Sequence, residues 1–193
     1  MKILVTGGAG YIGTVLIPML LEKNISVTTV DNYLFNQKFN FQHKNLKLIN
    51  GDVTDYKLIE KILKDRFDYI VPLAGLVGAP LCDLKPNKAK EVNEKAIEFL
   101  CQNIDIDTKI IVPTTNSGYG IGKKNIYCTE ESPLNPISVY GVTKVNAEKI
   151  ILKRGNAISF RLATVFGISP RMRLDLLVNH FVYKALKFKK IEI

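Results

Sequence analysis

The fold is decided by residues 2–13, KILVTGGAGYIG. The run Lys2–Thr6 is short, apolar and rich in β-branched residues, which predicts a buried strand. Glycines follow at positions 7, 10 and 13, a spacing typical of a chain that turns from a strand into a helix around a pyrophosphate. Gly7 would make the tight turn, Gly10 would admit the phosphate, and Gly13 would let the helix pack closely on the strand. A helix that begins near Gly10 would point its free N–H groups at that anion.

An acidic residue stands at the expected distance from this turn. Residues 25–30 form a second β-branched run, and Asp31 closes it, 18 positions after Gly13. A carboxylate there would accept hydrogen bonds from the adenosine ribose and would repel a 2′-phosphate. The sequence therefore predicts a site for NAD rather than NADP. The predicted contacts in this part of the chain are Gly7, Gly10, Tyr11, Ile12, Gly13, Asp31 and Asn32.

The composition bounds the class of protein. The chain has 193 residues, of which 47% are hydrophobic, enough for one α/β domain with a substantial core. The net charge is +9, but the lysines are scattered and do not alternate with stacking aromatics, so we expect no nucleic-acid partner. A basic protein that holds anionic nucleotides is the simpler explanation. No run approaches the roughly 18 apolar residues that span a bilayer, so we expect no membrane partner.

The cysteines and histidines indicate neither a disulfide framework nor a metal. Cys82, Cys101 and Cys128 are odd in number and lack C-x-x-C spacing, which is typical of free thiols in a reducing cytosol. His43 and His180 are too isolated to bind a metal. The apolar run at the N-terminus is too short for a signal peptide, and we expect a cytoplasmic protein.

Apolar runs alternate with helix-like segments along the chain. This alternation predicts an α/β fold, a Rossmann-type doubly wound parallel sheet with helices on both faces. Pro18 lies inside the first helix and is expected to bend it. We expect an NAD-binding domain over 1–165 and the start of an incomplete substrate-binding part over 166–193. Further strands are expected at 46–50, 69–73 and 109–113, helices at 11–23, 56–64, 91–103, 138–154 and 174–186, and loops at 32–45 and 116–136.

Polar and small residues follow the strands at the carboxyl edge of this sheet, where nucleotides bind in such folds. Asp52 follows the third strand, where it would accept from an adenine amine or cap the next helix. Small residues after the fourth strand would let the backbone approach the cofactor. Candidate cofactor contacts here are Asp52, Val53, Leu73, Ala74, Gly75 and Asn93, and candidate substrate contacts are Val77 and Gly78.

A tyrosine and a lysine supply candidate proton-transfer chemistry. Tyr140 and Lys144 are four residues apart on a helix that Ser138 would cap, so they share a face. A phenol has a pKa near 10, too high for a base at neutral pH. The ammonium of Lys144 and a cationic nicotinamide would favour the phenolate. The pair could then take a proton from a substrate hydroxyl while NAD accepts a hydride.

Five motifs in order resemble the extended short-chain dehydrogenase/reductase family: TGGAGYIG (6–13), Asp31, Asp52-Val53, TTNSGYG (114–120) and YGVTK (140–144). The resemblance covers nearly the whole chain and implies an NAD-dependent enzyme that modifies nucleotide-linked sugars. It implies that Thr115 hydrogen-bonds the reacting oxygen and that Tyr140 is the acid/base. It also implies that Lys144 binds the nicotinamide ribose and tunes Tyr140. The implied partners are a nucleoside-diphosphate sugar and a second copy of the chain in a homodimer.

Two departures from the family's pattern bear on which reaction is catalysed and on how the nucleotide is bound. Sugar 4,6-dehydratases of the family carry Asp-Glu after the threonine, where this chain has Asn116 and Ser117. Dehydration is therefore disfavoured, which leaves oxidation at C4, epimerisation or ketone reduction, and Asn116 and Ser117 become candidate substrate contacts. The family's Arg-x-x-Asn after the sixth strand is represented here by residues 161–164, with a threonine in place of the asparagine that contacts the nucleotide.

Three stretches are similar to one branch of the family, the bacterial GDP-heptose 4-dehydrogenases of capsule-sugar synthesis: LAGLVGAPLC (73–82), TTNSGYGIG (114–122) and RLATVFGISPRMRLDLLVN (161–179). This similarity implies oxidation at C4 of a GDP-manno-heptose by tightly held NAD, with 2-oxoglutarate as the acceptor that regenerates it. A nucleotide-sugar 4-epimerase uses the same residues and is the alternative. A non-catalytic NAD-binding protein is the alternative of another class, and it predicts loss of the Tyr/Lys pair that this chain retains.

The last part of the chain carries candidate contacts to the diphosphate. Arg171, Arg173 and Asn179 could reach it through bidentate hydrogen bonds. Exposed arginines before an amphipathic helix are an equal alternative. Members of the family carry a further segment that closes the sugar pocket, and residues 191–193 resemble the start of its first strand.

Overall fold

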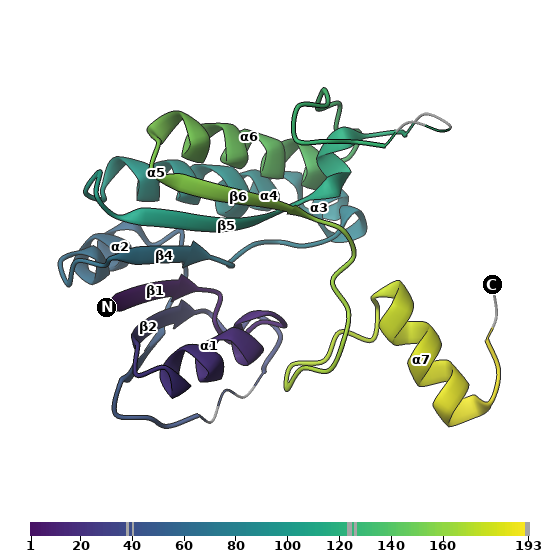
Figure 1. Ribbon diagram of the computed structural model, residues 1–193, viewed down its shortest axis with the longest axis horizontal. Helices are drawn as coiled ribbons and strands as arrows, with labels where there is room; N and C mark the ends of the chain where they lie inside the picture. Colours follow the sequence, from purple (N-terminus) through teal and green to yellow (C-terminus); the bar gives the residue numbers. More distant parts are fainter. Residues whose placement is uncertain (38, 40, 123–124, 126, 192–193) are drawn as a thin grey trace.

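One parallel sheet of six strands forms the centre of the protein (Figure 1). The computed structural model describes residues 1–37, 39, 41–122, 125 and 127–191. The strand order β3-β2-β1-β4-β5-β6 reverses direction between β1 and β4, which is where doubly wound sheets bind their ligands. The predicted fold class is confirmed. The strands are β1 (Lys2–Thr6), β2 (Ser26–Asp31), β3 (Leu46–Asn50), β4 (Tyr69–Pro72), β5 (Lys109–Thr115) and β6 (Ala157–Leu162).

Helices cover both faces of the sheet because successive strand residues point to opposite sides. Helix α1 (Gly13–Glu22) covers one face, where its Ile17 and Leu21 pack against Ile3 and Val5 of β1. The other face carries α2 (Tyr56–Leu63), α5 (Ala96–Gln102) and α6 (Val139–Arg154) (Figure 1). One buried cluster on that face includes side chains of α2 and α5 and consists of Leu4, Val30, Ile59, Ile62, Phe67, Ile70 and Leu100. A second includes side chains of α5 and α6 and consists of Ile97, Ile110, Val112, Ala147 and Ile151.

Of the two predicted helix caps, one is confirmed and the other is wrong. Ser138 caps α6, since its side chain accepts a hydrogen bond from Gly141 N at 3.1 Å, as predicted. Asp52 does not cap α2: that cap is Asp55, whose carboxylate accepts from Leu58 N at 3.1 Å. The capping alternative for Asp52 is therefore wrong, because the helix begins four residues after it.

The largest difference from the expected elements lies between β4 and β5. Residues 79–90 form α3 (Ala79–Leu84) and α4 (Pro86–Lys90), which the sequence did not predict, ahead of a π-helical turn, η1 (Glu91–Lys95), and α5. Pro80 and Pro86 look like loop signals, but each lies at one of the first two positions of its helix. There the missing N–H costs nothing and the fixed φ favours the helix.

Several element boundaries also differ from the prediction. Helix α1 begins at Gly13 rather than near Gly10, and β5 runs two residues further than expected, to Thr115. The 3₁₀ turn η2 (Asn116–Tyr119) opens the predicted loop. Arg161 lies inside β6, paired with Thr114, so the stretch 161–164 begins within the strand and not after it.

Helix α7 (Leu177–Phe188) stands apart from the sheet, at the end of a long connection from β6 (Figure 1). It begins three residues later than expected, at Leu177. Several of its apolar side chains are exposed, as are Ile158 and Phe160 of β6. The predicted boundary near residue 165 stays a prediction, and of the expected strand at 191–193 the last two residues lie outside the described ones. Within the described ranges, no helix combines the length and the apolar character needed to cross a bilayer.

Candidate functional site

The glycine-rich turn has the geometry that its spacing predicts. Gly7 has φ +72°, and a Cβ there would lie 2.5 Å from the backbone nitrogen of Ala74, so only glycine fits. A Cβ on Gly13 would lie 2.4 Å from the carbonyl oxygen of Gly8. The missing side chain therefore lets the start of α1 pack closely against the turn, and not against the strand as predicted. The first hydrogen bond of the helix region joins Thr14 N to Gly10 O, so the N–H groups before it face the turn.

Gly8 is a tightly packed glycine of the turn that the three-glycine spacing does not include. A Cβ on Gly8 would lie 2.0 Å from Thr29 Oγ1 and 2.7 Å from Ile17 Cδ1. Because Gly8 has no side chain, the turn can lie against β2, which ends at Asp31. The signal in the sequence was the glycine pair at positions 7 and 8, of which only the first belongs to the three-glycine pattern.

Asp31 lies at the turn, as its position predicts. It is 9% exposed, and its Oδ2 accepts a hydrogen bond from Ala9 N at 3.0 Å. Its Oδ1 accepts from Tyr33 N at 2.8 Å and from Gln37 Nε2 at 3.3 Å. The carboxylate thus holds the glycine turn to the end of β2, where the ribose of a dinucleotide is expected.

Asp52 and Asn32 meet at the same edge. Asn32 Nδ2 donates to Asp52 Oδ2 at 2.9 Å, and Thr54 donates to Oδ1 through its N–H at 2.9 Å and its hydroxyl at 2.7 Å. Burial raises the pKa of Asp52, but these hydrogen bonds and Lys88 lower it by more, so the group stays ionised well below neutral pH. Its contact with an adenine amine stays a prediction.

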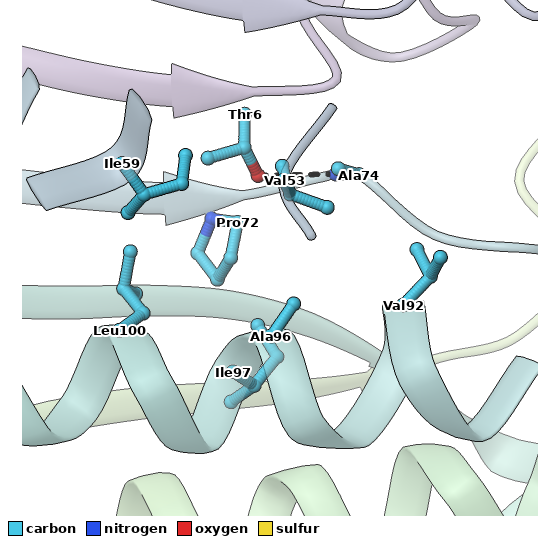
Figure 2. Close-up of a pocket in the computed structure, with 9 residues that line it drawn as sticks. All are labelled: Thr6, Val53, Ile59, Pro72, Ala74, Val92, Ala96, Ile97 and Leu100. Carbon is cyan, nitrogen blue, oxygen red and sulfur yellow. Dashed lines mark hydrogen bonds between the residues drawn. The ribbon is translucent and has the colours of Figure 1, made fainter. Parts of the chain in front are cut away.

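A small pocket lies below this edge, between the ends of the strands and α5 (Figure 2). Val53 and Ala74, two of the predicted cofactor contacts, line the same pocket. Thr6 Oγ1 accepts a hydrogen bond from Ala74 N at 3.3 Å, which ties the end of β1 to the chain after β4 (Figure 2). The remaining lining residues are Ile59, Pro72, Val92, Ala96, Ile97 and Leu100.

Asn93 supports the site from within the core. It lies in η1, is 2% exposed, and its Oδ1 accepts from Leu76 N at 2.8 Å. Its Nδ2 donates to Leu76 O at 3.0 Å and to Thr143 Oγ1 at 3.2 Å. Both amide protons are therefore used within the protein, and the side chain fixes the segment that carries Leu73, Ala74 and Gly75 against α6.

Thr115 and Tyr140 meet where β5 ends and α6 begins. Burial raises the pKa of Tyr140; a hydrogen bond with Thr115 and the charge of Arg173 oppose the rise, and Cys82 adds to it. The net direction is upward, whereas the sequence analysis expected Lys144 to lower this pKa. The expectation is not met because burial outweighs the effects that favour the phenolate, and Lys144 Nζ donates instead to Pro113 O, at 3.3 Å. Without ligands the phenol is protonated at neutral pH.

Lys144 lies in a strongly desolvated position. Burial lowers the pKa of its amine to about 8, although the charge of Glu148, one turn later, works against the shift. The side chain is therefore still charged at neutral pH but close to losing its proton. A lysine poised in this way is typical of functional sites.

A buried charge cluster supports α6 one turn further along, and the sequence analysis did not find it. Glu148 is 3% exposed and accepts from Arg161 Nε with both oxygens, at 3.1 Å each, and from Ser159 Oγ at 2.5 Å. Arg161 also donates to Tyr119 Oη at 3.2 Å and to Glu130 O at 2.9 Å. The only signal in the sequence was the four-residue spacing that continues from Tyr140 through Lys144 to Glu148.

The candidate substrate contacts fall into two groups. Asn116 and Ser117 are exposed beside Thr115, whose Oγ1 accepts from Ser117 N at 3.1 Å. Val77 is 43% exposed, and Gly78 has φ +94° at the start of α3. Their contacts with a substrate stay predictions.

The residues of the second group are engaged with the protein itself. Arg173 forms a two-pronged ion pair with Asp175, at 2.7 and 2.5 Å. The guanidinium of Arg171 lies 4.8 Å from the ring centroid of Phe35. Asn179 is 4% exposed and uses its amide for hydrogen bonds to three other groups of the chain, so it acts as a support.

The state of the cysteines agrees with the sequence. Cys82, Cys101 and Cys128 are free thiols. In the part of the chain that the structure describes, no group of three His, Cys, Asp or Glu side chains could hold a metal ion.

Comparison with known proteins gives a consistent family. Residues 3–193 match the model of the family described as NAD dependent epimerase/dehydratase. The UDP-glucose 4-epimerase of Lactobacillus helveticus is 36% identical over 174 residues, which cover 88% of this chain and 52% of the relative. The chain spans about half the length of the curated relatives it matches.

Solved structures give the same result. The UDP-glucose 4-epimerase of Thermotoga maritima, solved with UDP-glucose, superposes with a TM-score of 0.88 at 25% identity, over 100% of this chain and 65% of that one. The UDP-glucuronic acid 4-epimerase of Bacillus cereus, solved with NAD, superposes with a TM-score of 0.81 at 28% identity, over 97% and 63%.

Proposed function

The chain belongs to the NAD-dependent epimerase/dehydratase family, and we propose that it forms the cofactor-binding and proton-transferring part of an enzyme acting at C4 of a nucleoside-diphosphate sugar. One observation supports this most strongly. Thr115 ends β5, and Tyr140 and Lys144 lie in the first two turns of α6, so all three stand at the sheet edge where Gly7 makes a turn that no other residue fits. The cofactor of the family is NAD.

The residues at the edge fit a dinucleotide. The N-terminus of α1, beside the turn at Gly7, would offer N–H groups to a pyrophosphate, and Asp31 lies where a ribose would follow. Val53 and Ala74 line the small pocket that would lie under the adenine end. When bound, NAD accepts a hydride from the sugar carbon and can return it.

Three side chains would handle the proton. Tyr140 Oη takes the proton of the C4 hydroxyl as the ketone forms, and gives it back if the ketone is reduced. Thr115, already hydrogen-bonded to Tyr140, orients the same oxygen. Lys144, four residues after Tyr140 on α6, keeps its charge below a pH of about 8 and would hold the nicotinamide ribose.

Epimerisation at C4 is the net reaction that we propose first. It is supported by the 36% identical relative, named UDP-glucose 4-epimerase. Oxidation at C4 of a GDP-manno-heptose, with 2-oxoglutarate as acceptor and capsular or surface polysaccharide as destination, is the second candidate. It is supported by the similarity of residues 73–82, 114–122 and 161–179 to that branch. A homodimer and a cytoplasmic location are part of the same proposal.

The test uses the purified chain with NAD and each sugar nucleotide, followed by NMR of the products. Interconversion of UDP-glucose and UDP-galactose supports the epimerase, and a 4-keto product from GDP-manno-heptose with 2-oxoglutarate supports the oxidation. Tyr140→Phe should lower turnover by about 10²- to 10⁴-fold, because it removes the acid/base, while native mass spectrometry still finds NAD bound. Tyr127→Phe, at a phenol that is 93% exposed, is the matched control. Unchanged turnover in Tyr140→Phe would remove Tyr140 from its assigned role.

A further inference from the structure

Residues of the glycine-rich turn are hydrogen-bonded to a segment more than 150 positions later. Tyr11 Oη donates to Gly167 O at 2.6 Å. Ser169 Oγ donates to Tyr11 O at 2.8 Å and lies 2.9 Å from Thr14 Oγ1. The segment 167–179, which otherwise extends away from the sheet, is thus fastened at the N-terminus of α1.

Asn179 closes this arrangement from the first turn of α7. Its Nδ2 donates to Tyr11 Oη at 3.1 Å and to Arg173 O at 3.0 Å, and its Oδ1 accepts from Gly167 N at 3.0 Å. Asn179 is 4% exposed and Ser169 is 7% exposed. Tyr11 Oη both donates and accepts, so its hydrogen-bonding capacity in this environment is filled.

The same segment places a cation beside the proton-transfer residue. The side chain of Arg173 is 20% exposed, and its charge lowers the pKa of Tyr140. The phenols of Tyr140 and Tyr11 in turn raise the pKa of Arg173, after the larger effect of its hydrogen bond to Asp175. Arg173 is also tied to Asn179 through its backbone carbonyl, which accepts from Asn179 Nδ2 at 3.0 Å.

We propose that Tyr11, Thr14, Ser169 and Asn179 form a latch that couples the dinucleotide turn to the segment carrying Arg173, so that filling the dinucleotide site holds this segment in place. The proposal rests on the proposed function only in taking residues 7–13 as the NAD site. The backbone of Tyr11 belongs to the turn, and its phenol acts as a positioning group for the segment. The latch also assigns Asn179 a positioning role in place of a contact with the substrate diphosphate.

The coupling has a defined thermodynamic consequence. A dinucleotide that immobilises residues 7–13 lowers the conformational entropy lost when the latch forms. The 167–179 segment therefore opens less often when NAD is bound. Coupling is reciprocal, so a diphosphate that binds Arg173 would tighten NAD binding by the same factor. Couplings between sites are commonly five- to about 150-fold, and we expect about tenfold here.

Amide hydrogen exchange of the purified chain, with and without saturating NAD, tests the latch without any sugar nucleotide. In the native chain NAD should slow exchange in residues 7–14 and also, by about tenfold, in residues 167–179. In Tyr11→Phe the slowing within 7–14 should persist, while that within 167–179 should fall below about twofold. Ser169→Ala, a second small change, should act in the same direction, and Tyr127→Phe should behave as the native chain does.

The outcomes separate the latch from the proposed function. If NAD slows exchange in residues 7–14 of the native chain but not in residues 167–179, the latch is wrong and the NAD site stands. The same conclusion follows if NAD slows exchange in residues 167–179 equally in the native chain and in Tyr11→Phe. If NAD leaves 7–14 unchanged, the cofactor site is wrong and the latch falls with it. A chain that shows the latch yet leaves UDP-glucose unchanged loses the proposed epimerisation but keeps the coupling.

Discussion

Two successive turns of α6 hold opposite charges in opposite ways. Glu148 is surrounded by donors: Arg161 reaches both of its oxygens and Ser159 reaches one. Lys144, four residues earlier, donates to the uncharged Pro113 O at 3.3 Å, and burial lowers its pKa to about 8. The charge of Glu148 is therefore compensated by its hydrogen-bond donors, whereas the charge of Lys144 is desolvated and lowers the stability of the protein.

The difference teaches which buried charge serves the fold and which serves chemistry. A buried ion whose partners are all present is expensive to disturb, because removing it leaves those partners uncompensated. A buried ion without a counter-charge in contact destabilises the protein, and it persists where a ligand or a reaction uses it. The end of α6 that carries Tyr140 and Lys144 is therefore expected to gain stability from substitutions that end activity, and the Glu148 turn to lose stability.

The largest effect is expected at the compensated charge. Glu148→Ala should lower the free energy of unfolding by about 4 kcal/mol, because Arg161 would stay in place without its carboxylate. Urea unfolding at pH 7 measures the change. Glu98→Ala, at an exposed position of α5, is the control and should stay within about 0.5 kcal/mol of the native chain. If Glu148→Ala and Glu98→Ala lose equal stability, the ion pair of Glu148 does not stabilise the fold.

Lys144→Met should act in the opposite direction. The native pKa of about 8 lies below the ordinary value of 10.5, so below pH 8 the folded state carries a proton that its environment disfavours. The separation between the two pKa values corresponds to about 3 kcal/mol at most, and Lys144→Met should raise the free energy of unfolding at pH 7 by up to that amount. Turnover should be lost in the same variant.

The pH dependence gives the sharper measurement. Between pH 8 and 10.5 the unfolded chain binds more protons at Lys144 than the folded chain does, so native stability rises with pH in that window. The advantage of Lys144→Met should therefore shrink from pH 7 toward pH 10. Lys153→Met, at an exposed position of α6, should show no such trend. An advantage that is constant from pH 7 to 10 would contradict the lowered pKa.

The parts of this picture that follow from local sequence were predictable. Alternating and β-branched runs gave the sheet strands, and Ser138 gave the start of α6 because an N-cap is a short-range signal. Gly7 was assigned to a tight turn because its place after a strand leaves few backbone paths. Helical spacing predicts that Tyr140 and Lys144 share a face, and both lie on α6, while their roles stay predictions.

The missed features depend on contacts between residues far apart in the chain. Arg161 was considered as part of a motif after a strand, yet it lies within β6 and neutralises Glu148, 13 positions earlier. Asn179 was considered a substrate contact, yet it binds Tyr11, 168 positions earlier. The two prolines at 80 and 86 start helices that only packing against the core stabilises, and no local pattern distinguishes them from loop prolines.

The smallest effect tests the comparison at a neutral side chain. Thr114 is 7% exposed, follows the carbonyl that Lys144 contacts, and its hydroxyl has no hydrogen-bond partner within the described ranges of the chain. Thr108 is equally buried at 6%, but its hydroxyl donates to Phe67 O at 2.9 Å. Thr114→Val should therefore raise the free energy of unfolding by about 1 kcal/mol, and Thr108→Val should lower it by about 1 kcal/mol.

Urea unfolding of both variants measures the pair, since the chemical change is the same and only the hydrogen bond differs. If the Thr114 hydroxyl serves the cofactor, Thr114→Val should also weaken NAD binding by about fivefold, the equivalent of one hydrogen bond, while Thr108→Val leaves it unchanged. Equal losses of stability in the two variants would mean that the unpaired hydroxyl carries no cost. Stability would then not distinguish side chains kept for chemistry from those kept for the fold.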